Sequence, residues 1–287
     1  MKNQRNISLI ITATLLCIAL IGCKKKENKP EPAPADSDTS VAAENSLADA
    51  AFNDVQNISD QAARGTLVFY SPTYNGNDHM EESYEKTSCA TITHDSISIP
   101  HILTIDFGTT NCMCNDGKNR RGIINVSYTG SYRETGSVHT ITFEDYFVND
   151  NQLLGTKTVT NNGLNANNNL TFTIAVDGQL IKANNGGTHS WQSNRVREWL
   201  EGASTITWAD DVYSITGSAS GTAVNGNTYT AVITTALHRA LNCSWFDSGV
   251  LEITPANKPV RIINYGSGAC DSNATVTILG NTYPFTM

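Results

Sequence analysis

The cysteines are the residues whose type and spacing most clearly allow chemistry in this sequence. Of the seven in the 287-residue chain, five lie in its body: Cys89, Cys112, Cys114, Cys243 and Cys270. In an oxidising compartment thiols pair as disulfides, whereas clustered thiolates bind soft metal ions. The cysteines therefore pose a choice between covalent cross-links and a metal site.

A pattern that occurs twice predicts which cysteines pair. Cys89 is followed by an Ile-Asx-aromatic-Gly segment at 105–108 and then by Cys112. Cys243 is followed by the same kind of segment at 263–266 and then by Cys270. Such a repeated pattern indicates one supersecondary unit that occurs twice in the chain. We predict the disulfides Cys89–Cys112 and Cys243–Cys270, each stabilising the fold by roughly 3 kcal/mol.

Cys114 is then left over. The run Cys112-Met113-Cys114 offers sulfur ligands that suit Cu(I), and His94 or His101 would be the additional ligands. The alternatives are a structural disulfide beside a spare thiol, or an exchange of Cys112 and Cys114 as disulfide partners. A single Cys-x-Cys without a second ligand pair is a weak pattern, so we expect no metal.

Two pairs of adjacent carboxylates, Glu144/Asp145 and Asp210/Asp211, are the visible candidates for acid–base catalysis. Glycan hydrolysis needs two carboxyl groups held across the scissile bond. Neighbouring residues of a strand point to opposite faces, so neither pair forms such a site by itself. The six histidines are scattered, and the common hydrolase, metalloprotease and phosphate-loop motifs are missing from the sequence. We expect a non-enzymatic protein without catalytic residues or cofactor.

The four tryptophans offer a different chemistry. Exposed on one face, Trp191, Trp199, Trp208 and Trp245 would form a stacking platform for sugars or a groove for an apolar ligand. Large aromatic residues of a β protein are more often core. We expect them to be core.

The first residues have the pattern of a secretory signal, at 1–22. Lys2 and Arg5 form a basic region, residues 7–21 are mostly apolar, and the stretch ends in Leu20-Ile21-Gly22-Cys23. A retained transmembrane anchor is the alternative, but the apolar run is shorter than the roughly 20 residues a spanning helix needs. The ending resembles the lipobox of bacterial lipoproteins. That resemblance implies that Cys23 becomes the acylated N-terminus and attaches the protein to a lipid bilayer.

Residues 23–40 are expected to be a lipid-anchored flexible tether, because charged residues mix there with three alternating prolines. Lys24 stands where an Asp would signal inner-membrane retention in such lipoproteins, so the resemblance implies the outer membrane. The side on which the protein faces stays open. The net charge of -8 argues against nucleic acid as a partner.

The body, residues 41–287, is predicted to be one β-rich domain. Leu47, Ala51, Val55, Ile58 and Ala62 recur at helical spacing and predict an amphipathic helix at about 42–64. We expect this helix to cover its own sheet, with docking to a partner as the alternative.

Beyond it the apolar period is two, as in 170–176, and Asn-Gly-rich turns are predicted between strands at 74–77, 148–151 and 224–227. Residues 191–200 fit a strand better than a short helix. The fold class is all-β, mainly an antiparallel meander, as a sandwich or an open half-barrel.

Several segments, among them Thr104-Ile105-Asp106-Phe107-Gly108 and Tyr265-Gly266-Ser267-Gly268-Ala269-Cys270, resemble a group of uncharacterised outer-membrane lipoproteins of Gram-negative bacteria. The resemblance spans most of residues 41–287 and implies a location but no activity. The expected function is a non-enzymatic binding or structural module. A periplasmic carrier of an acyl chain or other hydrophobic ligand, and a cell-surface glycan-binding protein or glycan hydrolase, are the alternatives. The protein or glycan partner is unknown.

Overall fold

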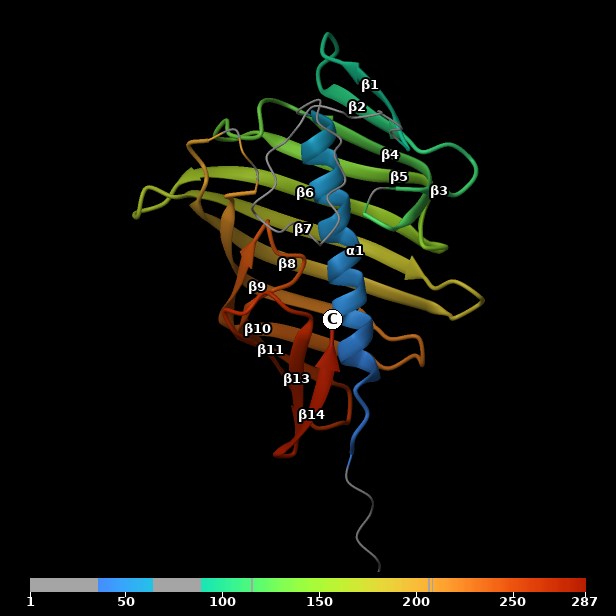
Figure 1. Cartoon of the computed structure of the whole chain (residues 1–287), viewed down its shortest axis with the longest axis vertical. Coiled ribbons are helices and arrows are strands. Elements are labelled where there is room, and N and C mark those ends of the chain that lie inside the picture. The colour runs from blue at the N-terminus through green and yellow to red at the C-terminus, as the bar shows by residue number, and fades with distance from the viewer. Residues whose placement is uncertain (1–35, 64–88, 115, 206, 208) are drawn as a thin grey trace, which may run out of the picture. The chain divides into compact units, whose positions relative to one another are not determined.

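The fold is one large antiparallel sheet with one helix lying across it (Figure 1). The computed structural model describes residues 36–63, 89–114, 116–205, 207 and 209–287. Within them the predicted all-β meander with one N-terminal helix is confirmed. The elements are α1 (Ser40–Ala63), β1 (Thr91–Asp95), β2 (His101–Asp106), β3 (Cys112–Met113), β4 (Asn119–Tyr128), β5 (Val138–Val148), β6 (Asn151–Leu164), β7 (Leu170–Ile181), β8 (Thr188–Glu201), β9 (Val212–Thr222), β10 (Thr228–Ala240), β11 (Ser248–Pro255), β12 (Arg261–Ser267), β13 (Asn273–Ile278) and β14 (Asn281–Thr286).

The sheet is open. Its fourteen strands follow chain order except that the short β3 pairs with β4, and within the described residues β1 and β14 form its two edges. Register shifts interrupt the pairing of β5 with β6 and of β9 with β10. Such bulges bend strands and increase their twist. Of the two predicted alternatives, the described chain forms a single open sheet rather than two packed sheets.

Two of the predicted turns lie where strands reverse. Asn149 and Asp150 link β5 to β6 with φ angles of 49° and 62°, the positive values that a two-residue hairpin turn requires. Gly226 has a φ of 84° between β9 and β10. The third predicted turn, at 74–77, lies outside the described residues.

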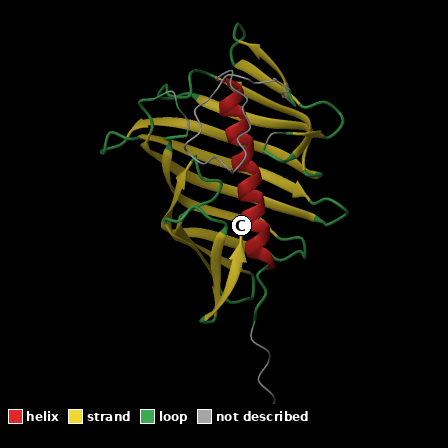
Figure 2. Cartoon of the chain, in the orientation of Figure 1, coloured by secondary structure: helices red, strands yellow, loops and turns green. Residues whose placement is uncertain are grey.

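Helix α1 covers the sheet (Figure 2). Ser40 begins it, and the Asp38 carboxylate accepts a hydrogen bond from the Ser40 amide at 3.0 Å. Four positions of the predicted apolar stripe are buried, but Leu47 is 38% exposed. Ala48 and Phe52 face the sheet instead, because the buried face is rotated by about one residue from the predicted one.

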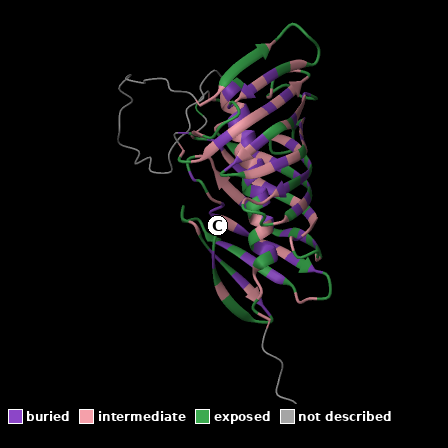
Figure 3. Ribbon diagram, turned by 90° about the vertical axis from the view of Figure 1, so that its right-hand side faces the viewer, coloured by how far each residue is buried: buried purple, intermediate pink, exposed green. Residues whose placement is uncertain are grey.

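The helix joins two clusters of core residues. Its N-terminal half packs with strands from β6 to β14, and Phe52 stacks on Trp191 at 5.6 Å between ring centroids. Its C-terminal half, including Val55 and Ile58, packs with β2, β4 and β5. Along the strands buried positions alternate with exposed ones (Figure 3). Each half of the helix therefore contributes to one of the two core clusters on the concave side of the sheet.

Ion pairs hold the residues that immediately precede α1. Asp36 pairs with Arg261 at 2.7 Å, and Asp38 pairs with Lys258 at 2.6 Å. Hydrogen bonds from Lys258 and Ser40 hold the pKa of the Asp38 carboxyl well below its ordinary value. These ion pairs attach the chain just before α1 to the sheet beside β12.

The packing of Phe52 on β7 gives a testable prediction. A Cβ added to Gly178 would lie 2.2 Å from Phe52 Cζ. We expect Gly178→Ala to cost about 1–3 kcal/mol of unfolding free energy, and Phe52→Ala about 3–5 kcal/mol. In the Phe52→Ala background the Gly178→Ala cost should shrink, because the clashing ring is gone.

Denaturant unfolding measures these costs. Gly130→Ala is the control, since its new Cβ would meet only the flexible end of Glu134. An equal cost of Gly178→Ala in both backgrounds would contradict the packing described.

Candidate functional site

Both predicted disulfides are present in the structure. Cys89 is bonded to Cys112 and Cys243 to Cys270, with Cα–Cα distances of 5.7 Å in each. Cys114 is a free, buried thiol, and burial raises its pKa. The predicted lipid attachment residue, Cys23, lies outside the described residues.

The arrangement around Cys114 does not assemble the metal ligands considered from the sequence. Cys112 is consumed by its disulfide, His94 contacts the Tyr128 hydroxyl, and His101 lies against the Tyr128 ring at 5.1 Å between centroids. Among the described residues, no group of three or more His, Cys, Asp or Glu could hold a metal ion.

The carboxylate pairs are held by separate contacts. Glu144 is exposed and accepts a hydrogen bond from Asn125 at 2.7 Å, while its neighbour Asp145 has a φ of 45° at a register shift. Asp210 accepts a hydrogen bond from Thr205, whereas Asp211 is buried. No catalytic geometry can be built from these contacts.

The tryptophans divide between core and boundary. Trp191 and Trp199 are 2% and 1% exposed on β8, which confirms the strand predicted there. Trp245 is half-buried, and Trp208 lies outside the described residues. A stacking platform built on Trp191 and Trp199 would therefore have no access to a sugar.

The strongest candidate site is one that the sequence did not reveal: a cavity of about 40 Å³ between α1 and the concave face of the sheet. Four basic side chains line it, Lys157 from β6, Arg195 and Arg197 from β8, and Arg239 from β10. Asp49 of α1 is the one carboxylate among the described residues that line it. The cavity therefore has a large excess of positive charge.

One of these cations is paired. Arg195 Nη1 donates to the Asp49 carboxylate at 2.7 Å, and both side chains are about 95% buried. The other Asp49 oxygen accepts from the Asn53 amide at 3.0 Å. Arg195 Nε and Nη2 are buried without a hydrogen-bond partner, so the ion pair leaves part of the guanidinium unused.

Arg197 has no carboxylate partner within the described residues. Its side chain is 8% exposed, and its Nε and Nη2 atoms are buried without an acceptor. The guanidinium lies over the rings of Tyr213 and Phe172, at 4.4 Å and 5.2 Å from their centroids. The faces of the guanidinium are thus packed, while N–H groups on its edge remain without acceptors.

The other two basic residues that line the cavity are Lys157 and Arg239. Lys157 is 1% exposed and donates to the Phe52 carbonyl at 2.9 Å. Loss of hydration lowers the pKa of its ammonium to about 8, although Asp49 and Asp60 act in the opposite direction. Loss of hydration also lowers the pKa of Arg239 to about 10. The shift at Lys157 expresses the cost of holding an ammonium away from water, whereas Arg239 is only partly buried.

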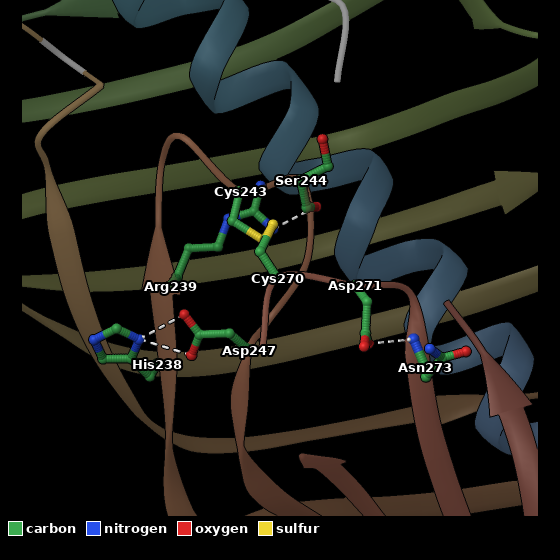
Figure 4. The surroundings of a disulfide bond; sticks show 8 residues. All are labelled: His238, Arg239, Cys243, Ser244, Asp247, Cys270, Asp271 and Asn273. Atoms are coloured by element: carbon green, nitrogen blue, oxygen red, sulfur yellow. Dashed lines mark hydrogen bonds and ion pairs between the residues drawn. A yellow bond between two sulfur atoms is a disulfide. The ribbon is translucent and has the colours of Figure 1, made fainter. Parts of the chain in front are cut away.

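The second disulfide, whose surroundings are shown in Figure 4, lies in a part of the chain that contributes residues to the cavity. It holds the β10–β11 loop, in which Ser244 accepts a hydrogen bond from Arg239 at 2.6 Å. Leu241 and Phe246 of the same loop line the cavity. The predicted bond Cys243–Cys270 thereby positions residues of a site that the cysteine pattern did not point to.

A signal for this site was present in the strand pattern. Once residues 188–201 are a strand, Trp191, Ser193, Arg195, Arg197 and Trp199 fall on one face. Two arginines between two buried tryptophans on one face indicate buried cations. The helix residue Asp49 and the strand residues Lys157 and Arg239 carried no comparable signal.

The chain matches no protein-family model, no curated protein and no solved structure. In residues 36–287, apart from those left undescribed, no helix is long and apolar enough to cross a membrane.

The lowered pKa of Lys157 predicts a dependence of stability on pH. Its ammonium titrates near pH 8 in the folded protein and near 10.5 when unfolded, so below pH 8 the buried charge destabilises the fold. This cost, on the order of 3 kcal/mol, is relieved as the pH rises from 8 to 10.5. Lys157→Met should remove that rise.

Unfolding free energies of the wild type and of Lys157→Met at pH 7 and pH 9.5 provide the measurement. The other titrating groups are common to both proteins, so the difference between the two isolates Lys157. Lys182→Met, at a partly exposed lysine, is the control. A constant difference between wild type and Lys157→Met at both pH values would show that the ammonium is hydrated.

Proposed function

We propose that this protein is an outer-membrane lipoprotein, anchored through acylated Cys23, whose β domain is a non-enzymatic binding module. The single observation that carries the anchor is the lipobox-like ending Leu20-Ile21-Gly22-Cys23 after a basic and an apolar stretch. One acyl chain binds a membrane only marginally, whereas two or three hold a protein permanently. The prolines between Cys23 and Asp36 would keep the domain at a distance from the bilayer.

The cavity supports binding rather than catalysis. Its lining combines cations and aromatic residues, and its one carboxylate is occupied by Arg195 and Asn53. Neither a histidine nor a cysteine is among the described residues that line it. Such a lining offers charge and hydrogen-bond donors to a ligand.

The alternative functions receive less support from the described residues. An acyl carrier needs an apolar tunnel, whereas the cavity of about 40 Å³ has room for two or three water molecules. An acyl chain would have to displace α1, whose apolar side is buried along its length. A glycan binder would need accessible tryptophans, and Trp191 and Trp199 are buried.

The anchor is tested by metabolic labelling with a clickable fatty acid in a lipoprotein-producing Gram-negative host, followed by membrane fractionation. We expect the wild type to be labelled and recovered with the outer membrane. Cys23→Ser should abolish labelling and leave the signal peptide uncleaved, because lipidation precedes cleavage in the chemistry that the lipobox implies.

Cys17→Ser is the matched control, because Cys17 is the other cysteine of the N-terminal stretch. It should be labelled and sorted like the wild type. Labelling that persists in Cys23→Ser, or a wild type without label, would contradict the proposed anchor.

A further inference from the structure

Among the described residues that line the cavity beside α1, basic side chains outnumber carboxylates by four to one. Burying a charge is costly unless it is paired and hydrogen-bonded. Lys157, Arg195, Arg197 and Arg239 line the cavity, and Asp49 is the one carboxylate among the lining residues. Asp49 binds Arg195, which leaves Arg197 without an anionic partner in the described chain. A bound anion would supply the missing charge.

The hydrogen-bond donors without acceptors come from two neighbouring positions on one face of β8. Arg195 and Arg197 are two residues apart on β8, so their side chains leave the same face of the sheet about 7 Å apart. Each has buried Nε and Nη2 atoms without an acceptor. An acceptor placed between the two guanidinium groups would satisfy donors from both.

The packing of Arg197 leaves these donors available. Rings of Tyr213 and Phe172 lie against the guanidinium, and cation–π contacts of this kind hold its plane without using its N–H groups. The planar guanidinium then presents paired donors in the geometry that carboxylate and phosphate oxygens match. A lysine at this position could not offer the same fork.

The volume restricts the ligand to a small group. A cavity of about 40 Å³ corresponds to two or three water molecules. That space suits an oxyanion rather than a larger organic molecule. The apolar residues around it, such as Phe52 and Ile215, would strengthen the electrostatic attraction by excluding water.

We propose that the cavity binds an oxyanion, phosphate or carboxylate, between Arg195 and Arg197, with Lys157 and Arg239 adding positive charge. This names the ligand class of the proposed binding module and rests on that proposed function. The chemistry is shared by a free inorganic ion and by the anionic head of a larger molecule whose remainder leaves the cavity.

The test is thermal unfolding of the detergent-purified mature protein with sodium phosphate, sulfate, acetate or glycerol 3-phosphate, each compared with sodium chloride at equal ionic strength. A ligand at a hundredfold excess over its Kd should raise the unfolding midpoint by roughly 5–10 °C. Inorganic phosphate acting best indicates a free ion, and glycerol 3-phosphate acting best indicates a head group.

Arg197→Gln should lose this response. Its own midpoint without ligand should equal or exceed that of the wild type, because the variant removes an uncompensated buried charge. Arg121→Gln is the matched control and should respond like the wild type, since Arg121 also stacks on an aromatic ring, Phe147, but pairs with the exposed Asp150.

Arg197→Lys keeps the positive charge but lacks the paired N–H donors of the guanidinium. Titration calorimetry should therefore show at least tenfold weaker anion binding by this variant. This measurement tests the proposal even if Arg197→Gln fails to fold. A wild type that responds to no oxyanion beyond chloride overturns the proposal. An equal response of wild type and Arg197→Gln, or equal affinities of wild type and Arg197→Lys, also overturns it. These measurements use no membrane, so the result with Cys23→Ser is independent of them.

Discussion

The structure depends on the burial of one face of α1 against the concave side of an open sheet. Strands β2 to β14 direct apolar residues to that side, and the sheet has no second sheet against it within the described residues. Apolar burial contributes about 25 cal/mol per Å². The helix supplies the opposing surface, and it links the cluster around Phe52 with the cluster around Ile58. Without it both clusters would face water.

Polar contacts fix where the helix lies on the sheet. Asn45 accepts a hydrogen bond from the Trp191 indole at 3.0 Å, Asp49 pairs with Arg195, and Lys157 donates to the Phe52 carbonyl. Because buried donors and acceptors must be matched, a shift of the helix by one turn would break all three contacts. The same polar side of the helix borders the cation-rich cavity. The contacts that fix the helix on the sheet therefore also help to form the candidate site.

Much of the fold could be predicted from local patterns. A period of two predicted the strands, the repeated pattern around the cysteines predicted both disulfides, and the apolar spacing predicted the helix. The exact buried face of the helix was missed at Leu47, since spacing alone does not tell which edge of a stripe faces the sheet. The open sheet was one of two alternatives, because strand patterns do not specify how far a sheet bends.

The cavity could not be predicted in the same way. Asp49, Lys157 and Arg239 are far apart in the chain and come together only through the pairing of β6 to β10 and the docking of α1. In the sequence two signals on residues 191–199 disagree: the tryptophans at 191 and 199 share a strand face with the arginines, whereas hydropathy favours burial of Val196 on the other face. In the structure the arginines are buried and Val196 is 43% exposed, the reverse of what hydropathy favours. Long-range packing decides that reversal.

Native-state hydrogen exchange of the α1 amides tests most directly whether the helix is a permanent part of the core. The account predicts that amides around Ala48 to Val55 exchange only through global unfolding, with the same opening free energy as the most protected amides of β7 and β8. Exchange of these helix amides at a clearly lower free energy, while the strands stay protected, would contradict it. Such a result would mean that α1 leaves the concave face of the folded protein, as a carrier of a large ligand would require.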